Sequence, residues 1–237
     1  MEIPIIYENE EVLVVNKPAG LVIHSDGKTN EPTLVDWILE KYPEIKNVGE
    51  LAEYDGKKIT RAGIVHRLDR ETSGVIIIAK TRDSYLNLKN QFQNRTISKT
   101  YNTFVHGKLK EKNGTIDLPI GRSKSDFRQW SAEKNTRGEL RDAITDYKVL
   151  KENEDYTYVE VNPKTGRTHQ IRVHFKAINH SLVCDKLYSP KRDCVLGFKR
   201  LALHARTLSF QLLNGETITT EADLPEDFEK ALSIIVN

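Results

Sequence analysis

Residues 63–80, GIVHRLDRETSGVIIIAK, combine a charged segment with a strongly apolar one. The apolar part, residues 75–78, contains only β-branched side chains and is bounded by Gly74 and Lys80. A short run of this kind is typical of a buried β-strand. The polar residues before it would then lie on a loop that a rigid core strand holds in place. The sequence therefore predicts a central strand with a fixed functional loop at its start.

Asp69 is the candidate catalytic residue of this loop. Arg67 and Arg70 flank it in the sequence and favour the ionised form of its carboxylate. An ionised carboxylate can act as a nucleophile or as a base. The alternative is a loop aspartate that pairs with arginine for stability. For an isolated pair of this kind the structural role is the commoner one.

The 237-residue chain has an ordinary globular composition, with 38% hydrophobic and 30% charged residues. No run reaches the ~18 apolar residues of a membrane span, and the start, MEIPIIYENEE, lacks the regions of a secretion signal. We therefore expect a cytoplasmic protein. The two cysteines, Cys184 and Cys194, are too few for a disulfide framework and are not spaced like zinc ligands. Reduced thiols are the expectation.

The charges are unevenly distributed along the chain. Residues 1–56 carry 4 basic and 12 acidic side chains, and residues 215–237 carry 1 and 6. Residues 57–214 hold 31 basic and 16 acidic ones, so the middle is strongly positive while the whole chain has a net charge of +2. A polyanionic partner accounts for this layout. A scatter of solvated lysine and arginine side chains accounts for it equally well.

Strands outnumber helices among the predicted elements and come mostly as neighbouring pairs. The expected strands cover residues 3–7, 11–15, 75–78, 97–109, 143–150, 156–161, 201–213 and 216–220. Helices are expected after the N-cap residues Thr33 and Thr81, over residues 167–179, and over residues 226–235. Residues 43–62 have loop character, and residues 110–142 are polar and rich in turns. This pattern favours an α+β fold with a mixed, mostly antiparallel sheet, in one domain over residues 1–237.

A second group of polar residues occurs in PKTGRTHQIRVH, residues 163–174. If a helix begins near Thr168, then Gln170 and His174 lie one turn apart, and Thr168 and Arg172 do too. Several donors would then meet at one helix end, where the helix dipole also favours an anion. Binding of a phosphate or carboxylate is the physical expectation. The alternative is an ordinary polar N-terminal turn.

Other catalytic patterns are missing from the sequence. It contains neither G-x-x-x-x-G-K-[ST] nor G-x-G-x-x-G, and Ser73 lies in T-S-G rather than in G-x-S-x-G. His169 and His174 are five residues apart, which does not fit H-E-x-x-H. We expect no nucleotide cofactor and no metal. Tyr101, near the start of a predicted strand, can stack on a nucleobase, although a strand tyrosine usually belongs to the core or the sheet surface.

Six motifs of the chain together resemble the RluA family of pseudouridine synthases. They occur in the family's order and cover most of the sequence. The two most specific are HRLDRETSG and GRTHQIR. The full set is NKPAGLVIH at 16–24, HRLDRETSG at 66–74, SKTYNTFVHG at 98–107, LPIGR at 118–122, GRTHQIRVHF at 166–175 and LALHA at 201–205.

The resemblance implies a mixed-sheet catalytic domain that isomerises uridine in RNA to pseudouridine, with the base flipped out and without cofactor or metal. The family's essential aspartate falls on Asp69, its active-site tyrosine on Tyr101, and the arginine that pairs with the aspartate on Arg172. Arg67 matches the arginine that helps displace and replace the flipped base. Further candidates for substrate binding are polar or cationic: His66, Thr72, Arg122, Arg128, Lys164, Arg167, His169 and Gln170.

Many relatives carry an RNA-binding S4 domain before the NKP motif, whereas 15 residues precede Asn16 here. We expect no S4 domain, and we expect residues 110–142 to help select a ribosomal or transfer RNA. One alternative is an RNA-binding protein without catalysis, which the presence of all three active-site residue types disfavours. Another is a carboxylate-dependent nucleosidase or glycoside hydrolase. That chemistry normally needs a second acid, and no other recognisable motif supplies one.

Overall fold

The computed structural model describes residues 1–25, 30–54, 57–132 and 136–235. It divides into two compact units, one formed by residues 1–98 and 205–223, the other by residues 99–204 and 224–237. The chain enters the second unit within strand β6 (Ser98–His106) and leaves it within β13 (Leu203–Gln211). The expectation of a single domain stays a prediction.

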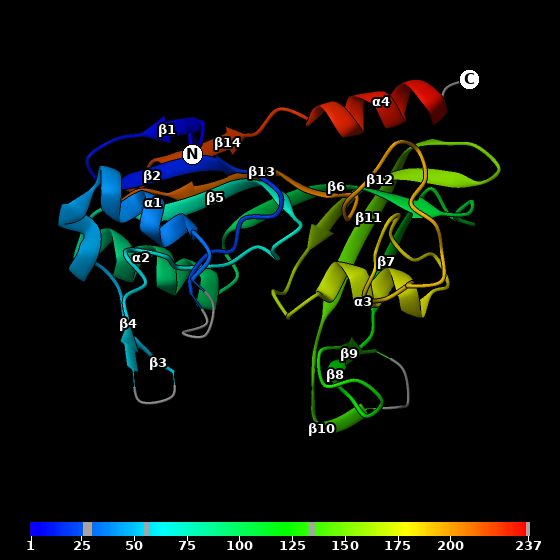
Figure 1. The fold of residues 1–237 in the computed structure, drawn as a ribbon, viewed down its shortest axis with the longest axis horizontal. Helices are drawn as coiled ribbons and strands as arrows, with labels where there is room; N and C mark the ends of the chain where they lie inside the picture. The colour runs from blue at the N-terminus through cyan, green and yellow to red at the C-terminus, as the bar shows by residue number, and fades with distance from the viewer. Residues whose placement is uncertain (26–29, 55–56, 133–135, 236–237) are drawn as a thin grey trace. The chain divides into compact units, whose positions relative to one another are not determined.

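The first unit is built on a sheet with the order β1-β2-β5-β13, to which β14 adds beside β13 (Figure 1). Its strands are β1 (Ile5–Glu8), β2 (Val12–Lys17), β5 (Ser73–Ala79), β13 and β14 (Thr217–Glu221). The predicted opening hairpin is confirmed, because β1 pairs with β2 in antiparallel fashion. The pairing of β13 with β14 is confirmed as well. The other elements are α1 (Leu34–Lys41), the 3₁₀ helix η1 (Pro43–Asn47), β3 (Ala52–Tyr54), β4 (Lys57–Ile59) and α2 (Arg82–Gln93).

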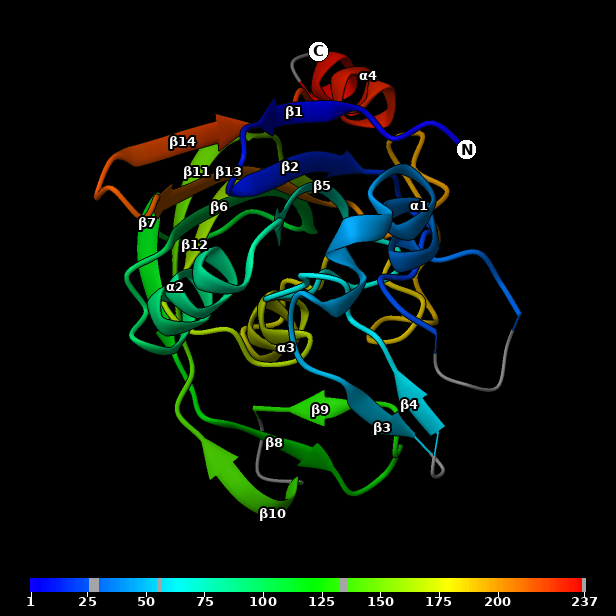
Figure 2. The same cartoon turned by 90° about the vertical axis from the view of Figure 1, so that its left-hand side faces the viewer.

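Strand β5 is the buried strand that the apolar run predicts, and all seven of its residues are buried. Val75 and Ile77 pack in one apolar cluster with Tyr85 and Leu88 of α2, and Figure 2 shows α2 lying against this sheet. Gly74, with φ +111°, is required here because a Cβ at this position would collide with the backbone of Ala205. The charged segment before β5 is therefore attached to the interior of the unit.

Both predicted helix N-caps of the first unit are confirmed. The Thr33 side chain accepts a hydrogen bond from the backbone N–H of Asp36, whose carboxylate accepts from the backbone N–H of Thr33. Thr81 and Ser84 form the same reciprocal pair at the start of α2. Such a capping box satisfies two backbone donors that a helix start would otherwise leave unpaired.

The second unit contains an antiparallel sheet with the order β6-β12-β11-β7. Its strands are β6, β7 (Asn113–Asp117), β11 (Ile144–Glu152) and β12 (Tyr156–Pro163), and its helices are α3 (Gln170–Ala177) and α4 (Glu226–Ile235). The helices α3 and α4 lie on opposite faces of this sheet (Figure 1). Val105 packs with Phe175 of α3, whereas Phe104 packs with Phe228 of α4. The alternation predicted for β6 is thereby confirmed.

A smaller sheet, with the order β10-β8-β9, lies on the other side of α3 from the main sheet of this unit (Figure 1). Its strands are β8 (Ile120–Ser123), β9 (Trp130–Ser131) and β10 (Thr136–Arg141). Ile120 of β8 packs with Val173 of α3 and with Tyr188. Helix α3 is therefore enclosed between two sheets, which explains why six of its eight residues are buried.

Two segments differ from the prediction. Residues 43–62 are not all loop, since they contain η1 and the β3–β4 hairpin. Residues 110–142 contain four strands, because short polar strands lack the alternation of apolar residues by which strands are recognised. Residues 55–56 and 133–135 of these segments lie outside the described residues. Among the described residues, no helix has the length and apolar character that crossing a membrane requires.

The expectation of reduced thiols is wrong for this structure, in which Cys184 and Cys194 form a disulfide with a Cα–Cα distance of 4.4 Å. The intervening chain folds back through consecutive turns, in which Ser189 N–H donates to the Asp185 carbonyl and Arg192 N–H donates to the Ser189 carbonyl. A spacing of ten residues does not reveal these turns. The α+β fold with a mostly antiparallel sheet is as predicted.

Candidate active site

Asp69 lies at the start of a tight turn that leads into β5. The backbone N–H of Thr72 donates to the Asp69 carbonyl at 3.1 Å, and β5 begins one residue later. Leu68 is buried in the core, Asp69 is partly exposed and Arg67 is exposed. The side chains therefore alternate between anchoring the segment and presenting charge to its surroundings. The predicted placement of the charged loop against the core strand is confirmed.

Lys17 clamps this turn to the NKPAG loop. Its fully buried ammonium group donates to the carbonyl oxygens of Pro18 at 2.8 Å, Leu21 at 2.9 Å and Arg70 at 3.1 Å. The backbone N–H of Gly20 also donates to the Arg70 carbonyl, at 2.8 Å. A charged donor makes a stronger hydrogen bond than a neutral one. The carbonyl next to Asp69 is therefore held by two donors from the NKPAG motif, a role that the motif alone did not reveal.

The other polar residues of the stretch support the turn. Nε of Arg70 donates to the Gly20 carbonyl at 3.2 Å, and its guanidinium pairs with Glu31. Nε2 of His66 accepts the backbone N–H of Ile77 at 3.1 Å, and its ring stacks on Phe92 with centroids 4.7 Å apart. The His66 contacts join the polar segment to β5 and α2, and the Arg70 contacts join it to Gly20 and Glu31.

Thr72 differs from these neighbours. Its side chain is buried, and Oγ1 has no hydrogen-bond partner among the described residues. Leaving a buried hydroxyl unsatisfied costs about 1–3 kcal/mol. A group with this cost and this position, three residues after Asp69, is a candidate for contact with a bound molecule.

Tyr101 and Arg172 both belong to the second unit. Tyr101 lies on the face of β6 that packs with Ile171 and Phe175 of α3, and Arg172 follows Ile171 in that helix. The structure therefore places these two candidates on the same side of the main sheet. Asp69 and Arg67 lie in the first unit, and their meeting with Tyr101 and Arg172 stays a prediction.

Arg172 forms a buried, bidentate ion pair with Asp185. Nε donates to Oδ2 and Nη2 donates to Oδ1, both at 2.8 Å, and the Asp185 side chain is almost fully buried. The backbone N–H groups of Leu187 and Tyr188 also donate to Oδ1 of Asp185. The Arg172 guanidinium lies over the Tyr188 ring at 4.9 Å. No motif quoted above contains Asp185 or Tyr188, so the sequence analysis did not identify them.

The Tyr188 hydroxyl joins three parts of the second unit. It accepts the backbone N–H of Trp130 at 3.0 Å and forms a 2.9 Å hydrogen bond with Nδ1 of His169. His169 precedes α3 with φ +56°, a left-handed conformation that is uncommon for a residue with a side chain. Its ring is therefore oriented both by its backbone and by Tyr188.

Gln170 and His174 are committed to the protein interior. The Gln170 carbonyl oxygen accepts from Thr165 Oγ1 and from the Arg167 N–H, and its amide nitrogen donates to the Ile144 carbonyl and to Thr145 Oγ1. All four hydrogen-bonding positions of this amide are used. His174 bonds Thr145 Oγ1 and the Leu118 carbonyl, and burial lowers the pKa of its imidazole. Both side chains tie α3 to neighbouring segments.

The cationic candidates have different surroundings. Arg122 lies over the Trp130 ring at 4.7 Å, and Nε of Arg167 donates to the Asp142 carbonyl at 3.0 Å. Arg128 forms a bidentate ion pair with Asp126, and its hydrogen bonds lower the pKa of the Asp126 carboxyl to about 2. Lys164 pairs with Asp146 at 3.1 Å. Arg128 and Lys164 therefore already have carboxylate partners.

Lys99 is a cation that the sequence analysis did not single out. It opens the second unit in β6, and burial lowers the pKa of its ammonium group. It has no carboxylate partner among the residues that the structure describes, and a Cβ added at Gly166 would lie 3.7 Å from its Nζ. Lys99 therefore lies beside the GRTHQIR segment, and its place in SKTY was the signal available in the sequence.

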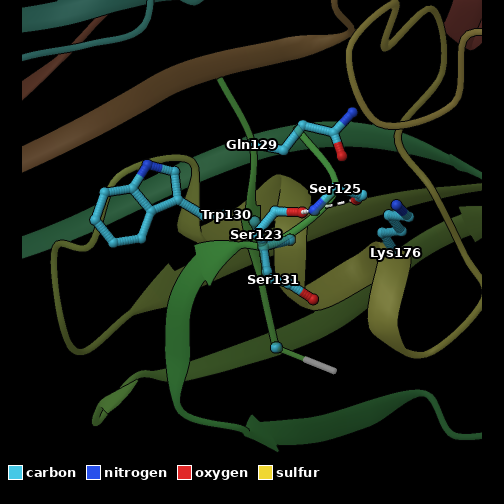
Figure 3. A pocket seen from close by; sticks show the side chains of 8 residues that line it. Ser123, Ser125, Gln129, Trp130, Ser131 and Lys176 are labelled. Carbon is cyan, nitrogen blue, oxygen red and sulfur yellow. Dashed lines mark hydrogen bonds between the residues drawn. The ribbon is translucent and has the colours of Figure 1, made fainter. Parts of the chain in front are cut away.

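A small polar pocket of about 60 Å³ lies between the small sheet and α3 (Figure 3). Its lining is Ser123, Ser125, Gln129, Trp130, Ser131, Ala132, Val173 and Lys176. The part of the chain that the structure describes holds no group of three or more His, Cys, Asp or Glu side chains arranged to bind a metal ion.

Comparison with known proteins identifies the family. The profile described as RNA pseudouridylate synthase matches residues 11–177. An uncharacterised RNA pseudouridine synthase of Bacillus subtilis (strain 168) is 37% identical over 233 residues, which are 98% of this chain and 72% of the relative. Ribosomal large subunit pseudouridine synthase D of Neisseria meningitidis serogroup B is 38% identical over 245 residues, which cover 99% of this chain and 62% of the relative.

Solved structures agree on the fold. Human RNA Pseudouridylate Synthase Domain Containing 4 superposes with a TM-score of 0.75 at 23% identity, and the match covers 98% of this chain and 93% of the human one. Human RNA Pseudouridylate Synthase Domain Containing 1 superposes with a TM-score of 0.74 at 24% identity, and the match covers 94% of this chain and 84% of the human one. The family profile matches residues 11–177, and the two relatives match 98% and 99% of this chain at 37% and 38% identity, so the chain belongs to the RluA family of RNA pseudouridine synthases.

Proposed function

We propose that this chain converts a uridine of a structured RNA to pseudouridine, with Asp69 as the catalytic carboxylate. The observation that carries the proposal is the support of the Asp69 turn by Lys17 on one side and by the buried strand β5 on the other. A reacting group must be held to within a fraction of an ångström to be effective. A loop aspartate with a merely electrostatic role does not need such a clamp.

The reaction breaks the glycosidic bond of uridine, turns the uracil and rejoins it to the sugar through carbon 5. Asp69 either attacks the anomeric carbon or removes the 2′ proton, and both routes need a carboxylate beside the ribose. The uridine leaves its stack to reach this carboxylate, which costs a few kcal/mol. A closed site keeps the detached uracil from being lost to solvent.

The other active-site residues have separate tasks in this proposal. Arg67, which is exposed, helps displace the base and fills the gap that it leaves. Tyr101 stacks on the uracil, and Arg172 supplies positive charge opposite the Asp69 carboxylate. The unsatisfied hydroxyl of Thr72 hydrogen-bonds the bound nucleotide.

RNA phosphates are bound by cations of the second unit. Arg122, Arg167 and Lys99 are not paired with a carboxylate among the described residues and are the first choice. The exposed cations Arg128 and Lys164 can exchange their carboxylate partner for a phosphate, because such surface pairs are weak. We assign a structural role to Gln170 instead, since all four hydrogen-bonding positions of its amide are used within the protein.

The similarity to ribosomal large subunit pseudouridine synthase D favours ribosomal RNA over transfer RNA. The test is to map pseudouridines in total RNA from cells with the gene, without it, and with the gene restored as wild type or as Asp69→Asn. We expect one or a few sites in large-subunit ribosomal RNA to disappear on deletion and to return only with the wild type. Sites lost from transfer RNA alone would correct the substrate. An unchanged map would contradict the proposed function.

A further inference from the structure

We propose that the pocket between the small sheet and α3 is a binding site for a single phosphate group of the RNA substrate, with Lys176 as its cation. The inference deepens the proposed function, since it assumes that the chain acts on RNA. The pocket lies wholly within the second unit. None of the candidate residues from the sequence analysis lines it.

The size of the pocket limits what it can hold. Its volume is about 60 Å³, whereas sites for drug-sized ligands measure roughly 300–1,000 Å³. A nucleobase or nucleoside does not fit into that space. A phosphate group is the small, charged part that RNA repeats at every nucleotide.

Charge makes the pocket a site for an anion. Among the described residues that line it, Lys176 is the only ionisable side chain, and none is a carboxylate. The Lys176 ammonium lies 5.7 Å from the Tyr188 ring and has no carboxylate partner among the residues that the structure describes. The nearby carboxylates of Asp126 and Asp185 are each bound to an arginine. Within the described part of the chain, no carboxylate therefore compensates the positive charge of Lys176.

Hydrogen-bond donors complete the site. Ser123 is buried, and its Oγ accepts the backbone N–H groups of Ser125 and Asp126, which occupies both lone pairs. Its proton therefore goes to Oγ of Ser125, 2.9 Å away, and the Ser125 proton is left to donate. The Gln129 amide uses one of its two protons on the Leu187 carbonyl. Figure 3 shows Lys176 on α3 opposite the loop that carries Ser125 and Gln129.

The pocket lies on the helix that carries Arg172, a candidate active-site residue. Val173 and Lys176 come from α3, the helix that carries Arg172, and Trp130 is joined through Tyr188 to both His169 and Arg172. A phosphate bound here fixes the RNA strand relative to α3. The small sheet thereby gains a defined contact with RNA, as expected of residues 110–142.

The test measures the affinity for the RNA substrate as a function of salt, from about 50 to about 200 mM. Each phosphate contact contributes about 0.7–0.9 to the slope of log affinity against log salt. We expect Lys176→Gln to reduce the slope by this amount and to weaken RNA binding most at the lowest salt concentration. Lys176→Arg should keep the wild-type slope. Ser125→Ala should weaken binding with little change in slope, because it removes a neutral donor.

Lys151→Gln is the matched control, since Lys151 is an exposed lysine of β11 in the same unit. It should behave like the wild type. A Lys176→Gln protein with the thermal stability and the salt slope of the wild type would overturn the phosphate site. A wild-type preparation that binds RNA but forms no pseudouridine would contradict the proposed function and not this site, because the two are measured separately.

Discussion

Asp69 and Thr72 are the first and last residues of one four-residue turn, but the surroundings of their side chains differ. Asp69 is partly exposed at the start of the turn, whereas Thr72 is buried and its hydroxyl has no hydrogen-bond partner in the described part of the chain. Buried polar groups without partners are rare in native proteins and call for an explanation. Contact with the substrate is the explanation that this position supports.

Replacing Thr72 by valine tests this explanation. Valine keeps the shape and removes the hydroxyl, so the free energy of unfolding should be unchanged or slightly raised. We expect kcat/KM for pseudouridine formation to fall by about 2–10-fold, the effect of losing one neutral hydrogen bond. Thr72→Ser should retain activity. If Thr72→Val turned over RNA like the wild type, the hydroxyl would have no role in binding.

Asp185 is the residue on which the orientation of Arg172 depends. Asp185→Asn leaves a buried guanidinium without its counter-charge, and breaking such a pair costs about 3–5 kcal/mol. We expect a lower melting temperature and, well below it, a reduced single-turnover rate with little change in RNA affinity. The matched control is Asp155→Asn, an exposed aspartate of the same unit. A folded Asp185→Asn enzyme with the wild-type rate would show that the pair is only structural.

The buried strand β5 fixes the position of the Asp69 turn that precedes it. At Gly74 the backbone of β5 packs closely against Ala205 of β13. An alanine at Gly74 adds a collision with the Ala205 backbone to the strain of a positive φ, which alone is worth about 1–3 kcal/mol. We expect Gly74→Ala to lose more unfolding free energy in urea denaturation than Gly215→Ala. Gly215 also has a positive φ but open space around it. Equal losses would mean that the contact with β13 is not tight.

The Cys184–Cys194 disulfide closes the loop that begins with Asp185. In the chain-entropy description, closing a loop of this length stabilises the fold by about 2–3 kcal/mol. Thiol titration of the denatured, non-reduced protein should find no free thiol, and reduction should lower the free energy of unfolding by about this amount. Two titratable thiols in the purified protein would contradict the disulfide.

At the scale of the whole molecule, the sequence predicts most elements because their signals are local. The apolar run of β5, the N-caps Thr33 and Thr81, and the alternation along β6 each arise within a few residues. The pair of Arg172 with Asp185 and the contacts of Tyr188 depend on how distant segments pack. No local pattern encodes them.

The candidate site was predictable to the same extent. The HRLDRETSG motif predicts Asp69 as a candidate, but the donation from Lys17 to the Arg70 carbonyl joins residues 53 positions apart in the chain. The commitment of Gln170 to Thr145 and Ile144 also follows from packing alone. The donor-rich helix start therefore predicts an anion site, although Gln170, Arg172 and His174 all bind other parts of the protein.

The most direct test of the central claim compares purified wild type, Asp69→Asn and Arg67→Ala on one RNA substrate. RNA affinity and the single-turnover release of the hydrogen from carbon 5 of uracil are measured together. We predict that Asp69→Asn binds RNA like the wild type and releases no hydrogen, whereas Arg67→Ala mainly loses binding. Turnover by a clean Asp69→Asn preparation would contradict the assignment of Asp69 as the catalytic carboxylate.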